Sequence, residues 1–195
     1  IGVLENLLDK VDNMIIGGGM AYTFVKANGG IIGNSICEDD QIETAKAIEK
    51  KAADKGVKLV MATDVLAADD FSGNGTNKIV PINEIPDGFE GVDAGPDSQK
   101  AFAEVIKNSK TILMNGPVGA FENPKFAEGT KAVLQAIVDA TKNGAVSVIG
   151  GGDSVSAAKK YFKAEDFTHV STGGGASLEY LEGKVLPGIA CIQDK

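Results

Sequence analysis

Two kinds of hydrophobic pattern alternate along the chain. Short apolar runs rich in β-branched side chains predict buried strands, and longer segments with apolar residues every three to four positions predict amphipathic helices. The predicted strands are residues 14–16, 57–62, 78–82, 111–114, 145–149, 168–171 and 188–192. The predicted helices are residues 1–8, 19–27, 40–55, 98–108, 124–143, 154–162 and 176–182. This alternation predicts an α/β fold: a doubly wound, mainly parallel sheet with helices on both faces, in a Rossmann-like three-layer arrangement.

Local signals mark where several of these helices begin and end. Asp97 and Asp153 stand where N-caps are expected, and Pro124 suits the first turn of a helix. Gly56 and Gly144 suit helix C-termini.

The length of 195 residues fits one domain. Within it, residues 69–91 are rich in Gly, Asn and Pro. We expect this stretch to form short strands and turns within the domain rather than a linker between domains.

Four glycine-rich turns each follow a predicted strand, within residues 14–20, 112–119, 146–154 and 170–177. Glycine is abundant overall, at 25 of 195 residues, against a usual share of about 7%. Backbone without side chains can approach a ligand closely and direct N–H groups at an anion. Because ligands bind at the carboxyl ends of parallel strands, the four turns predict one site for a phosphate-bearing ligand.

The turn at Gly17–Gly19 leads directly into a predicted helix, so its amides and the helix dipole could face an anion. Alternatively, these glycines only permit close packing of strand and helix. In the third turn, Asp153 is either an N-cap or, beside phosphate-binding turns, a ligand of Mg²⁺, which proteins usually bind through one or two carboxylates and substrate phosphates. Ser154 either adds a hydroxyl to the site or starts the helix.

The second turn has the sequence NGPVGAFE at residues 115–122. Asn115 could contact phosphate and Glu122 could accept hydrogen bonds from ribose, although an ordinary turn with a solvated glutamate is the alternative. The fourth turn repeats the strand, glycine and helix design, and its amides could stabilise a phosphoryl oxygen.

Charge and cysteine content narrow the classes of function. The net charge is −8 and all 19 basic residues are lysines, which argues against nucleic-acid binding. No apolar run approaches the roughly 18 residues that span a membrane, and the first residues show no signal-peptide pattern. We expect a cytoplasmic protein in which Cys37 and Cys191 are buried thiols rather than a disulfide.

Several catalytic signatures are absent from the sequence. There is no His/Cys cluster for zinc, no Walker A motif and no Gly-x-Gly-x-x-Gly fingerprint, so an NAD-linked oxidoreductase is disfavoured. His169 is the one histidine, and its place in a strand-like run indicates a structural role.

Five segments together resemble the C-terminal, nucleotide-binding lobe of phosphoglycerate kinase, in the family's order. They are residues 15–24 (IIGGGMAYTF), 85–96 (IPDGFEGVDAGP), 115–122 (NGPVGAFE), 149–154 (IGGGDS) and 171–188 (STGGGASLEYLEGKVLPG). The resemblance implies reversible phosphoryl transfer between 1,3-bisphosphoglycerate and MgADP, giving 3-phosphoglycerate and MgATP. In this family the two lobes close like a hinge, and the N-terminal lobe binds the glycerate.

The resemblance also implies a role for individual residues. The adenine slot would be formed by Gly17, Gly18, Gly19, Ile36, Gly91 and Val92. Asn115 and Pro117 would flank the nucleotide, and Glu122 would hold the ribose. Asp153 would serve Mg²⁺, with Gly151, Gly152 and Ser154 near the phosphates. Catalysis would involve Gly152 and the amides of Gly173, Gly174 and Gly175, which would stabilise the transferring phosphoryl group.

The sequence also departs from the family's pattern. Met114 and Ser154 stand where the family usually has tryptophan and often threonine. A Gly-Gly-Ala-Lys segment with its strand and two phosphate-facing lysines, and the arginine-bearing glycerate lobe, would precede Ile1. We therefore expect residues 1–195 to be the nucleotide-binding lobe alone, with a gap in its sheet and weakened nucleotide affinity.

On this interpretation the chain is a fragment of a monomeric kinase and has negligible activity by itself. It would meet 3-phosphoglycerate or 1,3-bisphosphoglycerate only through the absent N-terminal lobe. A non-catalytic nucleotide-binding module is the alternative.

Overall fold

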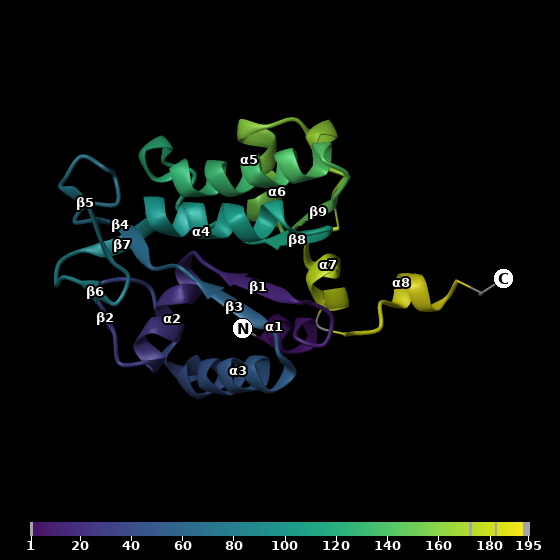
Figure 1. Ribbon diagram of the computed structural model, residues 1–195, viewed down its shortest axis with the longest axis horizontal. Coiled ribbons are helices and arrows are strands. Elements are labelled where there is room, and N and C mark those ends of the chain that lie inside the picture. Colours follow the sequence, from purple (N-terminus) through teal and green to yellow (C-terminus); the bar gives the residue numbers. More distant parts are fainter. Residues whose placement is uncertain (1, 172, 182, 193–195) are drawn as a thin grey trace.

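A computed structural model describes residues 2–171, 173–181 and 183–192 (Figure 1). Parallel strands form three sheets in this part of the chain, and two of them carry the glycine-rich turns. In the first, β1 (Asn13–Ile16) pairs with β3 (Lys58–Met61). In the second, β9 (Val146–Gly150) lies between β8 (Thr111–Asn115) and β10 (His169–Val170). Most predicted parallel strands are therefore present, within one or two residues of the expected bounds.

The remaining strands form a smaller, mainly antiparallel region. Here β4 (Asp64–Ala68) pairs with β5 (Asn77–Pro81) on one side and β7 (Glu90–Ala94) on the other. A short parallel pair joins β2 (Ile31–Ile32) to β6 (Glu84–Ile85). Residues 69–91 thus form short strands and turns within the domain, as expected. The strands β4 and β7 at either end of this stretch are not predicted by the hydrophobic pattern.

Helices cover both faces of the strands, which confirms the predicted α/β class. Both α3 and α4 contact β3, and Figure 1 shows α2 and α3 on one side of β1 and β3 with α4 and α5 on the other. The helices are α1 (Gly2–Leu7), α2 (Gly19–Ala27), α3 (Ile42–Lys55), α4 (Pro96–Lys107), α5 (Glu128–Lys142), α6 (Gly152–Tyr161), α7 (Gly174–Leu181) and α8 (Pro187–Ala190). Three 3₁₀ turns accompany them: η1 (Asp39–Gln41), η2 (Pro124–Phe126) and η3 (Ala164–Asp166).

Two predictions about helix starts are wrong. The N-caps of α4 and α6 are Gly95 and Gly151, so Asp97 and Asp153 each lie one residue inside the helix. At α4 the capping carboxylate comes from another element: Asp64 of β4 accepts the amide N–H groups of Asp97, at 3.1 Å, and Ser98, at 2.7 Å. A cap supplied across 34 residues leaves no local signal in the sequence. In contrast, α3 ends at Lys55 with Gly56 as its C-cap, and η2 begins at Pro124, as predicted.

The prediction of a strand at residues 188–192 is also wrong. Pro187 is the first residue of α8, where a fixed φ angle and a missing N–H are tolerated. The two cysteines are free thiols, as expected, but Cys37 is only half-buried and Cys191 is exposed. Ile1, Thr172 and Glu182, which belong to predicted segments, lie outside the described residues.

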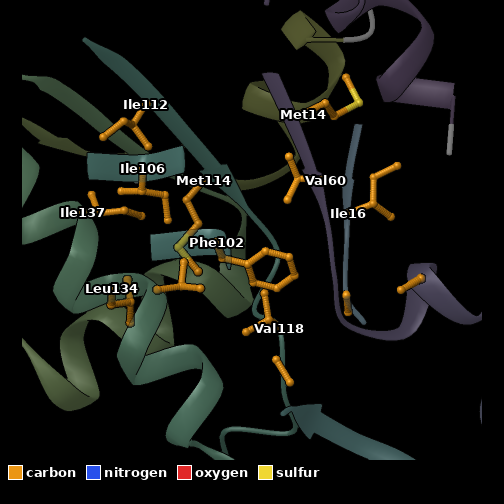
Figure 2. Packing of buried hydrophobic residues seen from close by; sticks show 14 of the residues in the cluster. Met14, Ile16, Val60, Phe102, Ile106, Ile112, Met114, Val118, Leu134 and Ile137 are labelled. Atoms are coloured by element: carbon orange, nitrogen blue, oxygen red, sulfur yellow. The ribbon is translucent and has the colours of Figure 1, made fainter. Parts of the chain in front are cut away.

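The main core lies between the strands and the helices that cover them. Figure 2 shows Phe102 of α4, Met114 of β8 and Leu134 of α5 facing the side that carries Val60 of β3. Phe102 and Leu134 are fully buried. No helix in the described ranges is long and apolar enough to cross a membrane. The core thus fixes the strands whose carboxyl ends carry the glycine-rich turns.

Candidate functional site

The four glycine-rich turns follow β1, β8, β9 and β10 directly. We call them the first turn (residues 17–19), second turn (residues 115–122), third turn (residues 150–154) and fourth turn (residues 171–177). Because the strands of each ladder are parallel, these turns lie at the carboxyl ends of their strands, where α/β proteins bind ligands.

The first turn packs directly against the second. Gly18 has a φ angle of +63°, and a Cβ atom there would lie 2.6 Å from the carbonyl oxygen of Pro117. A Cβ atom at Gly17 would lie 2.9 Å from Cγ1 of Val118. Side chains larger than hydrogen are therefore excluded from this contact. This geometry supports close packing as one role of the first turn, and it brings Gly17–Gly19 beside Pro117.

A buried hydroxyl joins the second turn to the third. Ser154 is fully buried, and its Oγ accepts the N–H of Gly116 at 2.6 Å. Gly151 has a φ angle of +82°, and a Cβ atom there would collide with Oδ1 of Asn115. Ser154 therefore both lies in the first turn of α6 and holds two of the predicted turns together.

Asp153 lies in the first turn of α6 with its side chain exposed, and no side chain caps this helix. Gly152, the first residue of the helix, is exposed as well. Within the described residues, no three His, Cys, Asp or Glu side chains cluster around a common point. A divalent cation at Asp153 would therefore take its remaining ligands from a substrate and water, which suits Mg²⁺ bound to a nucleotide. The positive end of the α6 dipole favours phosphates at the same place.

On the other side of the first turn lies an exposed isoleucine. Ile36 is 68% exposed, and its Cδ1 atom fills the space where a Cβ atom of Gly19 would be. The neighbouring Ser35 accepts the N–H of Gly91 through its Oγ at 2.9 Å. Ile36, Gly19 and Gly91 are thereby brought together, with an apolar side chain beside bare backbone. Such a surface can receive the flat face of an aromatic ring.

The end of the second turn is held in place by hydrogen bonds to its backbone carbonyl oxygens. Lys160 donates to the carbonyl oxygens of Phe121 at 3.2 Å and Glu122 at 3.0 Å, and the Tyr161 hydroxyl donates to Phe121 at 2.8 Å. The carboxylate of Glu122 remains exposed. A fixed backbone with a free carboxylate is a suitable acceptor for ligand hydroxyl groups.

The fourth turn is linked to the third through a cavity of about 460 Å³, whose lining includes Asn115, Gly151, Ser171 and Ser177. The hydroxyls of Ser171 and Ser177 lie 2.7 Å apart, and Ser171 Oγ accepts the N–H of Gly173 at 3.1 Å. Gly174 and Gly175 form the first turn of α7. Among the described residues that line the cavity there is no lysine. Most of the remaining lining is apolar, including Ile112 and Leu186, so a phosphate here would be confined to the amides and hydroxyls of the two turns.

One buried carboxylate beside the site is not marked by any motif. Asp93 of β7 is 2% exposed, and it accepts the N–H groups of Gly129 at 2.7 Å and Ala94 at 2.9 Å. Burial raises the pKa of Asp93 to about 7, although the hydrogen bonds from backbone amides partly oppose this shift. The available signal is an aspartate within the apolar stretch GVDA, directly after Gly91 and Val92.

Comparisons with known proteins give a consistent result. Phosphoglycerate kinase from Coxiella burnetii is 42% identical, with a TM-score of 0.92 over 97% of this chain and 48% of that chain. Phosphoglycerate kinase from Pyrococcus horikoshii is 27% identical, with a TM-score of 0.80 over 97% of this chain and 47% of that chain. The chain thus spans about half the length of the solved structures it matches. Since the family model described as phosphoglycerate kinase also matches residues 1–184, the chain belongs to the phosphoglycerate kinase family.

Proposed function

We propose that residues 1–195 are the nucleotide-binding lobe of a phosphoglycerate kinase and bind an adenine nucleotide along the joined glycine-rich turns. One observation carries this proposal: the first turn packs on the second, the second is hydrogen-bonded to the third, and a cavity joins the third to the fourth. Turns that are separate in sequence thus lie next to one another at the strand ends, and their backbone amides and helix N-termini would form one binding surface. This surface suits a ligand with several phosphates.

The nucleoside would lie at the end formed by the first turn. Adenine would be received by Gly17–Gly19, Ile36 and the Gly91–Val92 backbone, where an exposed apolar side chain adjoins bare backbone. Asn115 and Pro117 would flank the nucleotide, and the exposed carboxylate of Glu122 would accept hydrogen bonds from the ribose.

The phosphates would lie at the third and fourth turns. Mg²⁺, when bound, neutralises charge on the transferring group, and Asp153 would hold it together with phosphate oxygens. The exposed backbone of Gly152 and the amides of Gly173, Gly174 and Gly175 would stabilise the phosphoryl oxygens. No side-chain nucleophile is needed, because phosphoryl transfer depends mainly on positioning and charge neutralisation.

A first experiment tests the role of Asp153. Asp153→Ala should weaken binding of MgADP by about ten- to hundredfold, since it removes a charged ligand of the metal. Binding of ADP in the presence of a chelator should change much less. Isothermal titration calorimetry of both ligands measures the difference.

Asp97→Ala is the matched control for this experiment, because Asp97 is an exposed carboxylate at the same position of α4. This variant should bind MgADP as the wild type does. Equal losses of MgADP and metal-free ADP binding by Asp153→Ala would assign the carboxylate to the helix terminus instead.

The reaction itself is the reversible transfer of a phosphoryl group between 1,3-bisphosphoglycerate and MgADP, to give 3-phosphoglycerate and MgATP. The acidic substrate would be bound outside these residues, because the chain contains no arginine to clamp a carboxylate and phosphate together. We therefore expect negligible turnover when the chain alone is supplied with 3-phosphoglycerate and MgATP in a coupled assay.

Robust turnover in that assay would contradict the assignment of glycerate binding to another part of the enzyme. Nucleotide binding without any turnover is also what a non-catalytic nucleotide-binding module would show. Adding a separately produced N-terminal lobe of a family member separates the two, since only a kinase lobe should then support transfer.

A further inference from the structure

The buried carboxylate of Asp93 lies where three elements meet. Asp93 belongs to β7, its Oδ2 accepts the N–H of Gly129 at 2.7 Å, and Gly129 is the second residue of α5. Its Oδ1 accepts the N–H of Ala94 at 2.9 Å. The carboxylate thus replaces the missing intrahelical partner of one amide at the start of α5.

The second turn closes over the same carboxylate. A Cβ atom at Gly119 or at Gly129 would collide with Oδ1 of Asp93. The N–H of Gly119 is donated to Oγ1 of Thr130 on α5 at 3.1 Å, and the N–H of Ala120 to the carbonyl oxygen of Val92 on β7 at 2.8 Å. The turn therefore contacts both elements that the Asp93 carboxylate holds together.

We propose that Asp93 is a positioning residue for the nucleotide: its ionised carboxylate fixes the second turn and the start of α5 against β7. This inference rests on the proposed function, because β7 carries Gly91 and Val92 of the adenine end and the second turn carries Asn115 and Glu122. The distance between β7 and the second turn, which bound the nucleotide on two sides, then depends on the buried charge of Asp93. Asp93 itself would not touch the nucleotide.

Protonation should disturb this arrangement. Each carboxylate oxygen of Asp93 accepts a backbone N–H. A proton bound to either oxygen would add an O–H donor beside one of these N–H donors and weaken that hydrogen bond. The titratable groups that interact with Asp93 electrostatically include Glu128, Tyr22 and Lys131. Lys131 is paired with Glu128 at 2.8 Å, so its charge is largely engaged at the surface.

Asp93→Asn tests the proposal, since it keeps the shape of the side chain and removes its charge. The Kd for MgADP of wild type and variant is measured by calorimetry between about pH 6 and 8.5. We expect a variant to wild-type Kd ratio of about three to ten at the alkaline end, where Asp93 is ionised. The ratio should fall towards one at the acidic end. Titration of the nucleotide's own phosphates cancels in this ratio.

Asp64→Asn is the matched control, because Asp64 caps α4 through two amides but does not contact the second turn. This variant should lower thermal stability and leave the Kd for MgADP unchanged at every pH. A Kd ratio for Asp93→Asn that is the same at all pH values would overturn the proposal, since a merely structural role gives a constant loss. A wild-type chain that binds no ADP at any pH would remove the proposed function, and this inference with it.

A measurement on the wild type without nucleotide separates these outcomes and does not depend on a variant that folds. The backbone amide signals of Gly129 and Gly119 are followed by NMR against pH. We expect both to shift with one common midpoint, because both residues pack on the same carboxylate. Titration of Gly129 without Gly119 would show that Asp93 does not control the second turn.

Discussion

Ser154 has a role in the fold that its sequence context does not reveal. It lies in the first turn of α6, and its hydroxyl reaches across to the second turn, where it accepts the N–H of Gly116 at 2.6 Å. The hydroxyl of Ser154 is fully buried, whereas Gly116 is exposed, so water can replace part of this contact if the hydroxyl is lost. At this residue, the contact that shapes the candidate site is also one that stabilises the fold.

Ser154→Ala should therefore lower the free energy of unfolding by about 0.5–1.5 kcal/mol, because it removes the hydroxyl that accepts the N–H of Gly116. Urea denaturation followed by circular dichroism measures the change. Ser154→Thr keeps the hydroxyl and should retain more of the stability.

Ser156→Ala is the control for this prediction, since Ser156 lies exposed on the same helix. Its effect on the free energy of unfolding should stay within about 0.5 kcal/mol. Equal effects of the two alanine substitutions would show that the hydrogen bond between Ser154 and Gly116 contributes nothing measurable.

At the scale of elements, the sequence predicts well those helices and strands that are marked by the local pattern of apolar residues and glycines. The bounds of α2 are those predicted, and β1, β8 and β9 lie within a residue or so of theirs. In each case a continuous apolar run meets a glycine-rich turn, so strand, turn and helix are marked within a few residues. The placement of the four turns at strand ends follows from the same local signals.

Two strands of the antiparallel sheet, β4 and β7, were not predicted, whereas β5 lies within one residue of the strand predicted at residues 78–82. The sequences of β4 (DVLAA) and β7 (EGVDA) are short, contain acidic and small residues, and lack the alternation of a half-buried strand. They are strands because they pair with each other and because β4 pairs with β5. A short stretch of sequence contains only one of the two strands that pair, so the pairing leaves no local signal.

Two carboxylates of this region were missed for the same reason. Asp64 caps α4 and Asp93 holds the start of α5, and each acts on residues more than 30 positions away. In sequence, Asp64 looks like a solvated aspartate, and the available sign of burial for Asp93 is its place in the apolar stretch GVDA. The positions of the glycine-rich turns at strand ends could be predicted, whereas the buried groups that hold these turns could not. The contacts of individual site residues with a ligand stay a prediction.

At the scale of the whole molecule, Asp93 should make stability and nucleotide binding respond oppositely to pH. Its pKa is 3.8 ordinarily and about 7 when folded, because burial disfavours the charged form. Between these values the native state retains a proton that the unfolded chain has released. The stability from this proton is fully present below about pH 4 and is lost as the pH rises through 7. Binding, in contrast, should favour the ionised carboxylate.

This opposition gives the last prediction. Between about pH 5 and pH 8 the free energy of unfolding of the wild type should fall, relative to that of Asp93→Asn, by about 1–3 kcal/mol. Urea denaturation of both proteins at the two pH values measures the difference, in which the titration of all other groups cancels. Parallel stability profiles would mean that Asp93 is not held protonated in the fold. If the wild type gains stability at low pH and also loses MgADP affinity there, the ionised form of Asp93 destabilises the fold but favours nucleotide binding.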